Sequence, residues 1–590
     1  MPKRSVEDIK DESRGLRGTI VPTLHSDATH FTDDDYQLLK FHGTYQQDDR
    51  DLRIERKRAG LDKAWSFMVR SKMAGGECTA DQYLQHDDIA EDLGVGNLRI
   101  TTRQGFQIHG ILMGGLKDCI ARIKDSGLTT LGACGDVVRN TMSPAAPFDD
   151  AAHRDAQVLA EEMTELFLPE TDSYLSIWLN GEKLMLDEEE KATEAPAEPI
   201  YGKHYLPRKF KIAIAVPPRN DVDVFTQDLG FISHVVDGEV EGYTVTVGGG
   251  FGMSHGKTVT RPYLAQPLFY VKRAHVLEAA EAVVTTQRDY GNREDRKLAR
   301  MKYLVASKGI DWFRQEVTSR MKGETFPAKE LVFDTVGDAL GWHEQGNGKL
   351  LLGVWIEEGR VADATSAKYR SAMRELAEKF RLPLRLTPNC NVIYFDIDPK
   401  DKDAIDELLR RHNIPHTDEF TEARKTAHAC VALPTCGLAL AESERVFPSL
   451  MDKIDGILRE LKLEKEAILF RMTGCPNGCA RPYNADIGFV GRAPGKYAFY
   501  VGGSIRGDRL VGLEEKTVPF DELPGKVRPV LEEYAANRHE GESFTDYWGR
   551  THVNGEEPSA DQFHVELAAR AERMAAAKAA KEAAPAPVQG

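Results

Sequence analysis

The sequence predicts an α/β (α+β) fold that is duplicated within the chain, with a small and a larger mixed lobe in each of two halves related by pseudo-two-fold symmetry. The first observation is an alternation of strand-like and helix-like segments that starts near residue 61 and returns in the same order near residue 349. The second is a pair of short echoes. RITTRQGFQI (99–108) resembles RLTPNCNVIY (385–394), and GYTVTVGGG (242–250) resembles KYAFYVGGS (496–504). Each echo is weak alone, but their preserved order favours a duplication.

The individual elements follow from periodicity. Apolar–polar alternation predicts strands, listed in chain order as 64–73, 97–112, 205–214, 349–361 and 384–397. A 3.6-residue period predicts helices, listed as 81–94, 115–128 and 366–380, the first ending at Gly94. The predicted divisions are an N-terminal arm that wraps other parts (1–60), a small lobe (61–135), a large lobe (136–325), a second small lobe (326–420), a second large lobe (421–560) and a flexible tail (561–590). An exposed loop is predicted at 188–199.

Composition excludes several classes of protein. The 590 residues contain 77 Lys and Arg against 93 Asp and Glu, a net charge of −16, which disfavours a nucleic-acid binder. No apolar run is long enough to cross a membrane, and residues 1–15 lack the apolar stretch of a signal peptide. Eight cysteines are too few for a disulfide scaffold in a chain of this length. We therefore expect a cytoplasmic protein that binds neither nucleic acid nor membrane.

Four cysteines lie within 50 residues of one another in two short segments. Cys430 and Cys436 belong to HACVALPTCGLALAESER (428–445), and Cys475 and Cys479 belong to FRMTGCPNGCARPYNADIGFVG (470–491). Four thiolates from two loops are the usual ligands of a [4Fe–4S] cluster, and the Pro-Asn-Gly between the second pair predicts a turn that lets its thiols converge. A structural zinc site and unrelated buried cysteines remain open at this point. The five-residue gap between the first pair fits zinc less well.

Basic residues interrupt otherwise apolar segments. Arg70 ends SFMVR, Arg139 lies in DVVRN, and Lys209 and Lys211 alternate in YLPRKFKIAI. A spacing of two in a strand would place both lysines on one face, where an anion between them would relieve their repulsion. A solvated sheet edge is the alternative.

No nucleotide-binding fingerprint is complete. GGGFGMSHGKT (248–258) has Phe251 where a P-loop needs its first glycine, and no G-x-G-x-x-G occurs. Electrons for any redox reaction would therefore come from another protein.

The two cysteine segments closely resemble the cluster-binding segments of assimilatory sulfite reductase hemoproteins, which belong to the siroheme- and [4Fe–4S]-containing nitrite and sulfite reductases. The resemblance continues through FHGTYQQDDRD (41–51), RITTRQGFQIHGIL, GACGDVVRNTMSPAAP, HYLPRKFKIAI and VVTTQRDYGNREDRK, and it spans about residues 15–550 in order. It implies a fold of two ferredoxin-like half-lobes and two larger lobes.

The resemblance also implies roles for individual residues. Cys430, Cys436, Cys475 and Cys479 would bind the cluster, and Cys479 would also be the axial ligand of siroheme iron. Arg70, Arg139, Lys209 and Lys211 would bind sulfite. The residues implied to contact siroheme are Arg99, Thr101, Arg103, Gln107, Arg300 and Lys302, of which the first four would all face one way along a single strand. His109 is predicted to be a structural histidine, and a proton donor is the alternative.

The implied activity is the six-electron reduction of sulfite to sulfide. FHGTYQQDDRD resembles the form reduced by an NADPH-dependent flavoprotein, whereas GACGDVVRN resembles the ferredoxin-dependent form, so both donors stay open. A siroheme nitrite reductase and a non-catalytic iron–sulfur protein are the alternative functions.

Overall fold

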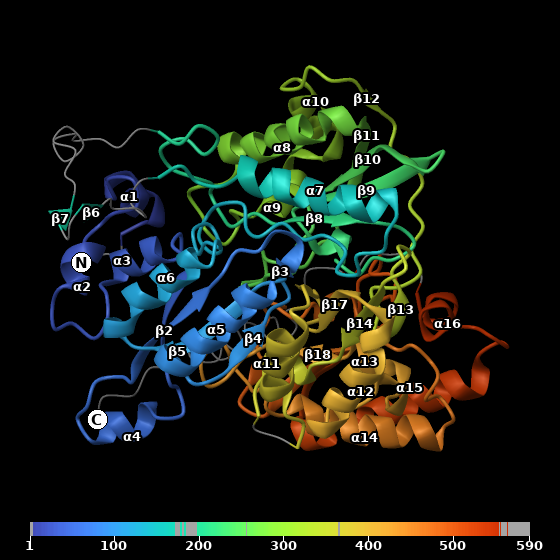
Figure 1. The fold of residues 1–590 in the computed structure, drawn as a ribbon. Helices are drawn as coiled ribbons and strands as arrows, with labels where there is room; N and C mark the ends of the chain where they lie inside the picture. The colour runs from blue at the N-terminus through green and yellow to red at the C-terminus, as the bar shows by residue number, and fades with distance from the viewer. Residues whose placement is uncertain are drawn as a thin grey trace, which may run out of the picture.

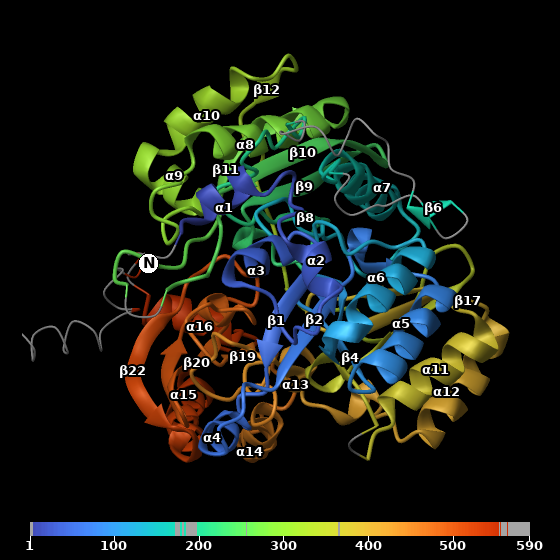
Figure 2. The ribbon, with the colours of Figure 1, turned by 90° about the vertical axis from the view of Figure 1, so that its left-hand side faces the viewer.

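A computed structural model describes residues 4–171, 178–179, 182–183, 197–254, 257–363, 366–553, 555, 558 and 563. Residues 188–196 of the predicted loop and 564–590 of the predicted tail lie outside the described residues. The main body contains four five-stranded sheets. Figure 1 shows one large lobe, with β8 to β11 (residues 212–272), at the top and the other, with α14 (Phe447–Glu460) and α15 (Leu523–Asn537), at the bottom. Figure 2 shows the two small lobes side by side at the right.

The two small sheets have the same strand order. The first runs β1 (Thr44–Asp48), β2 (Trp65–Arg70), β5 (Phe106–Ile111), β4 (Leu98–Ile100) and β15 (Arg360–Val361). The second runs β13 (Gly341–Glu344), β14 (Leu350–Val354), β17 (Val392–Ile397), β16 (Leu384–Leu386) and β3 (Glu77–Cys78). Each sheet takes its last strand from the other half of the chain. This reciprocal exchange confirms the duplicated fold and joins the halves through backbone hydrogen bonds.

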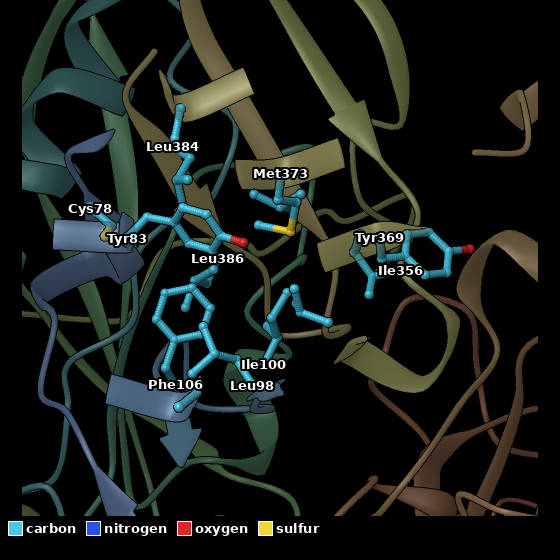
Figure 3. Close-up of a cluster of buried hydrophobic side chains, with 14 of the residues drawn as sticks. Cys78, Tyr83, Leu98, Ile100, Phe106, Ile356, Tyr369, Met373, Leu384 and Leu386 are labelled. Carbon is cyan, nitrogen blue, oxygen red and sulfur yellow. The ribbon is translucent and has the colours of Figure 1, made fainter. Parts of the chain in front are cut away.

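The two small lobes also share one hydrophobic core. Helices α5 (Ala80–Leu93) and α6 (Leu116–Asp125) belong to the first, and α11 (Tyr369–Phe380) and α12 (Lys402–Arg411) to the second. Figure 3 shows Tyr83 of α5 between Leu384 and Phe106, with Met373 of α11 beside them. Tyr83 and Leu384 are completely buried. Burial on this scale across the junction holds the two halves in a fixed relation.

The two large sheets share a parallel strand pair that is followed by an antiparallel hairpin. The strands of the first are β12 (Thr325–Phe326), β11 (Gln266–Lys272), β10 (Glu239–Val247), β9 (Leu229–Val236) and β8 (Ile212–Ala215). Those of the second are β18 (His428–Ala429), β19 (Phe470–Thr473), β20 (Ile487–Ala493), β21 (Lys496–Val501) and β22 (Gly512–Pro519). The pairs β8–β9 and β19–β20 are parallel, and the hairpins that follow them are antiparallel. The helices that accompany these sheets are α7 (Ala151–Leu166), α8 (Val276–Tyr290), α9 (Met301–Lys308), α10 (Ile310–Thr318), α14 (Phe447–Glu460), α15 (Leu523–Asn537) and α16 (Phe544–Thr551).

Several predicted strands were too long. The segment 97–112 is a hairpin, β4 and β5, whose turn at 101–105 is closed by the Thr101 amide donating to the Gly105 carbonyl at 3.0 Å. The segment 384–397 is likewise the hairpin β16–β17, and 349–361 divides into β14 and the exchanged β15. Lys209 and Lys211 precede β8 instead of lying within it. Alternation continues through such tight turns in the sequence, so periodicity does not reveal them.

The N-terminal region is more structured than an arm of low periodicity suggests. It contains α1 (Val6–Glu12), α2 (Ile20–Leu24), α3 (Asp33–Leu39), β1 and α4 (Arg53–Arg58). Lys10 Nζ donates to the Leu206 carbonyl at 3.0 Å, which connects α1 to the first large lobe. Near the other end of the chain, Phe563 is buried and its ring stacks on Tyr500. Within the described part of the chain, no helix is both long and apolar enough to cross a membrane.

Candidate functional site

The loops that carry Cys430 and Cys475 lie side by side because each follows one of two neighbouring parallel strands. Cys430 follows β18 directly, and Gly474-Cys475 follows β19, so both loops leave the same edge of the sheet. The Cys430 amide donates to the Met472 carbonyl at 3.2 Å. The Gly474 amide donates to Cys430 Sγ at 3.3 Å, and Asn477 Nδ2 donates to Cys475 Sγ at 3.4 Å. Such donors stabilise charge on sulfur.

The remaining two thiols lie in turns that other elements hold in place. Arg50, between β1 and α4, donates from Nη1 to the Cys436 carbonyl at 3.1 Å. Gly478 has φ +62°, and a Cβ there would lie 2.8 Å from the Tyr483 ring. Only glycine fits this turn without displacement, so it brings Cys479 back toward Cys475. This is the turn predicted from Pro-Asn-Gly.

Neighbouring thiols add to the effect of burial on the pKa values of two of these cysteines. Burial, with the charges of Cys479 and Cys436, raises the pKa of Cys475 to about 12, and burial with its three partners raises the pKa of Cys430 well above its usual value. Among the described residues, no three His, Cys, Asp or Glu side chains surround a single ion position. A [4Fe–4S] cluster, with one iron for each thiolate, needs more widely spaced ligands than a single ion does. The arrangement of the thiols therefore does not support the zinc alternative.

A row of polar side chains crosses the first small sheet. Arg70 on β2 is paired in register with Gln107 on β5, Gln107 with Arg99 on β4, and Arg99 with Arg360 on β15. Residues paired directly across strands share a face, so these four side chains lie on one side of the sheet. The other face carries the apolar row of Val69, Ile108, Leu98 and Val361. Arg99 and Gln107 therefore share a face, as predicted, but the reason is that β4 and β5 pair them directly and not that they belong to one strand.

The turn at 101–105 changes the prediction for Thr101 and Arg103. Thr101 accepts a hydrogen bond from the Arg103 amide through its hydroxyl at 3.3 Å. The Arg103 side chain is buried and donates to the Ile212 carbonyl at 3.0 Å, where β8 begins. The prediction that both continue one strand face was wrong, because the backbone reverses at this turn. Arg103 nevertheless reaches the region of Lys211.

Arg139, Lys209 and Lys211 share a face because of a parallel bridge. Val138 pairs with Phe210, and the Arg139 amide donates to the Phe210 carbonyl at 2.9 Å. The side chain of Phe210 is buried on one face of the bridge. Arg139, Lys209 and Lys211 come directly after or beside the bridged residues, so their side chains point to the opposite face. Burial, with Arg208 and Arg300 nearby, lowers the pKa of Lys209 to about 7, and the Cys479 thiolate opposes this effect. Lys209 is thus electrostatically coupled to the fourth thiol, Cys479.

Comparisons with known proteins agree with this arrangement. A model for the nitrite and sulphite reductase 4Fe-4S domain matches residues 134–325, and one for the nitrite/sulfite reductase ferredoxin-like half domain matches 62–126 and 343–412. A protein from Staphylococcus haemolyticus (strain JCSC1435), the sulfite reductase [NADPH] hemoprotein beta-component, is 44% identical over 95% of this chain and 97% of its own length. The protein of that name from Staphylococcus carnosus (strain TM300) is 45% identical over 92% and 94%. The chain belongs to the sulfite reductase hemoprotein family.

Membership in the sulfite reductase hemoprotein family confirms the resemblance and the cofactors that it implies, siroheme and a [4Fe–4S] cluster. The half-domain model matches twice, which confirms the two ferredoxin-like half-lobes. The structure of Mycobacterium tuberculosis NirA protein superposes with a TM-score of 0.75 over 93% of this chain and 97% of that chain. At 24% identity, this likeness concerns the fold alone.

The described residues fit an anionic tetrapyrrole such as the siroheme of this family. Arg70 Nε and Lys72 Nζ are buried without a hydrogen-bond acceptor among the described residues, and so is Nη1 of Arg99, whose Nε lies 3.3 Å from Glu444. Buried cationic groups need a compensating anion, and siroheme carries many carboxylates. Cys479 is exposed, and its carbonyl accepts from the Thr102 hydroxyl at 3.3 Å, which joins the thiol loop to the turn at 101–105.

Other predicted siroheme ligands already have partners within this hemoprotein. Arg300 forms an ion pair of 2.8 Å with the buried Asp228, and Lys302 donates to the Gly250 and Gly252 carbonyls at 3.0 and 2.9 Å. Arg99 lies 3.3 Å from Glu444 and donates to the Ala429 carbonyl at 2.8 Å. Their siroheme contacts therefore remain predictions.

Sequence reasoning missed Lys72 and Asp228. Lys72 is 3% exposed, and burial with Arg139 nearby lowers its pKa to about 8. The Ser71 hydroxyl bonds His86 of α5, so Arg70 and Lys72 point to the opposite side of the strand. The spacing of two from Arg70 could have identified Lys72, but no local signal identifies Asp228 as the carboxylate near Arg103, Lys211 and Arg300.

His109 does not have the hydrogen bonds expected of a structural histidine. It is 4% exposed, and neither ring nitrogen has a partner among the described residues. Burial, with Arg360 nearby, lowers its pKa to about 3.

Proposed function

We propose that this chain is the catalytic hemoprotein that reduces sulfite to sulfide. The observation that carries the proposal is the face shared by Arg139, Lys209 and Lys211, together with the coupling of Lys209 to Cys479. The four cysteines would hold the [4Fe–4S] cluster, and Cys479 would also ligate siroheme iron. The bound cofactors supply low-potential electrons and an iron that binds the substrate.

The cations of the protein have two tasks, holding sulfite and supplying protons, and the lysine ammonium groups take part in both. Sulfite has three acceptor oxygens, so Arg70 and Arg139 would hold it through charge-assisted hydrogen bonds. As each oxygen leaves as water it takes up two protons, and Lys209 and Lys211 are suited to supply them because lysine gives up a proton more readily than arginine. Lys72, a buried ammonium on the same side of the strand as Arg70, would add to the positive field.

The proposed electron donor is an NADPH-dependent flavoprotein. Support comes from the [NADPH] in the names of the relatives from both Staphylococcus species. NADPH transfers a hydride, whereas an iron–sulfur cluster accepts single electrons, so a flavin must stand between them. Ferredoxin is the alternative donor, since GACGDVVRN resembles that form.

Substrate choice tests the proposal directly. With reduced methyl viologen as donor, we expect the purified holoprotein to release sulfide from sulfite, with a kcat/KM for sulfite above that for nitrite. A preference for nitrite would support the siroheme nitrite reductase instead. Absorption bands of the cluster without those of siroheme, after expression with siroheme supplied, would support the non-catalytic iron–sulfur protein.

The affinity for sulfite should depend on pH through Lys209. Its pKa of about 7 means that the ammonium is present below pH 7 and is lost as the pH rises through that value. We therefore expect the KM for sulfite to rise across this range. Lys209→Arg is the matched control, because arginine stays protonated across this pH range. The titration of sulfite itself is the same in both assays and therefore cancels in the comparison. Identical pH profiles for the two proteins would show that Lys209 does not set this dependence.

A further inference from the structure

Exposed apolar side chains gather beside the Cys436 loop. Leu438, two residues after Cys436, is 68% exposed. On the neighbouring N-terminal segment, Leu52, Ile54 and Leu61 are 40, 66 and 56% exposed. Isolated apolar side chains at the surface are ordinary, but a group beside a predicted redox centre marks an interaction surface. We call residues 52–63 together with Leu438 the Leu438 surface.

The two parts of this surface are connected by Arg50. Its amide donates to the Pro434 carbonyl at 3.2 Å, and its guanidinium donates to the Cys436 carbonyl at 3.1 Å. Asp51 and Arg445 form a second link at 2.7 Å. A cavity of about 690 Å³ lies where the parts meet, and the residues that line it include Leu52, Arg56, Lys63 and Thr435. Figure 1 shows α4 projecting from the body at the lower left, and Figure 2 shows it from that side, in front of the second large lobe.

The charge of the Leu438 surface differs from that of the chain. Residues 53–63 contain five Lys and Arg, of which Arg53 pairs with Asp48, but only Glu55 and Asp62 as acids, whereas the chain has a net charge of −16. Lys57 and Arg58 are exposed, and no ion pair with another described residue is present for either. A locally basic surface on an acidic protein attracts acidic partners and steers their approach.

We propose that the Leu438 surface docks an acidic flavin-bearing domain, which passes electrons to the cluster through the Cys436 loop. This inference rests on the proposed function. Each encounter would move one electron from the flavin to the cluster, with no bond formed or broken. Leu438 is separated from a cluster ligand by one residue, so a flavin edge packed against it would be near the cluster, and electron transfer weakens steeply with distance. Apolar contact at the centre and charge at the rim is the usual arrangement of such transient interfaces.

The test uses the holoprotein and reduced flavodoxin, a small acidic FMN protein, as the probe. The variants are Lys57→Glu/Arg58→Glu and Leu438→Glu. The matched control is Lys400→Glu/Arg410→Glu near α12, which lies away from α4 in both views and also reverses two exposed cations. Binding is measured by calorimetry at low and high salt, and sulfide production is measured with flavodoxin and with methyl viologen.

We expect both surface variants to weaken flavodoxin binding about tenfold and the control to bind normally. For the charge variant the reason is that a charge at the rim of an interface acts chiefly on the association rate. High salt should abolish the difference for the charge variant. Methyl viologen should support equal turnover in all four proteins, since it needs no docking surface. Unchanged binding by both surface variants, or no binding by the parent protein, would overturn the docking proposal. Failure of the parent protein with methyl viologen would instead overturn the proposed function.

Discussion

Cys479→Ser is expected to abolish sulfite reduction and to disturb both cofactors at once. The reason is that one thiolate would serve the cluster and the siroheme iron, and serine is a poor ligand for either. Loss of siroheme absorption together with lowered iron and acid-labile sulfide would be the direct readout. We expect turnover with methyl viologen to fall by a factor of about a thousand or more, as for loss of a group required at the reacting centre.

The matched control is Cys119→Ser. Cys119 is also a free thiol, but it is buried on α6 in the core of the first small lobe. This variant should keep both cofactors and its turnover. A Cys479→Ser protein with the spectrum and iron content of the parent would show that residue 479 is not shared between the two centres.

Lys209→Ala and Lys211→Ala should separate catalysis from assembly. Both lysines flank Phe210 on the face of the parallel bridge that also carries Arg139, and neither is predicted to hold a cofactor. Removing a preorganised cation from such a site typically costs about 10²–10³ in kcat. Burial among cations lowers the pKa of both lysines, so their loss relieves repulsion and leaves no charge unpaired. We therefore expect unchanged spectra and a loss of turnover of that size.

Lys453→Ala on α14 is the corresponding control, because it removes an exposed ammonium from a helix that carries none of the four cysteines. Normal turnover by both pocket variants would mean that sulfite is held and protonated by other groups, of which Arg70, Lys72 and Arg139 are the nearest candidates.

The sequence by itself was sufficient for the duplicated fold and for the two cysteine loops. The order of periodic segments survives in both halves, and the turn between Cys475 and Cys479 is encoded locally by Pro476 and Gly478. Lys209 and Lys211 were also placed together correctly on one face, although the predicted strand begins only at Ile212. Local rules of spacing are enough for such features.

The tertiary structure decided which charges meet. The row of polar side chains is formed by Arg70, Gln107, Arg99 and Arg360, and it is complete only because β15 crosses from the second half into the first sheet. A strand of two residues is too short for periodicity to predict it. The turn at 101–105 directs Arg103 toward β8, and Asp228 reaches Arg300 across 72 positions of sequence. Spacing alone could have pointed to Lys72, but its burial without a hydrogen-bond acceptor among the described residues is a property of the folded chain. Such contacts depend on how elements far apart in the chain pack together, and local sequence carries no record of that packing.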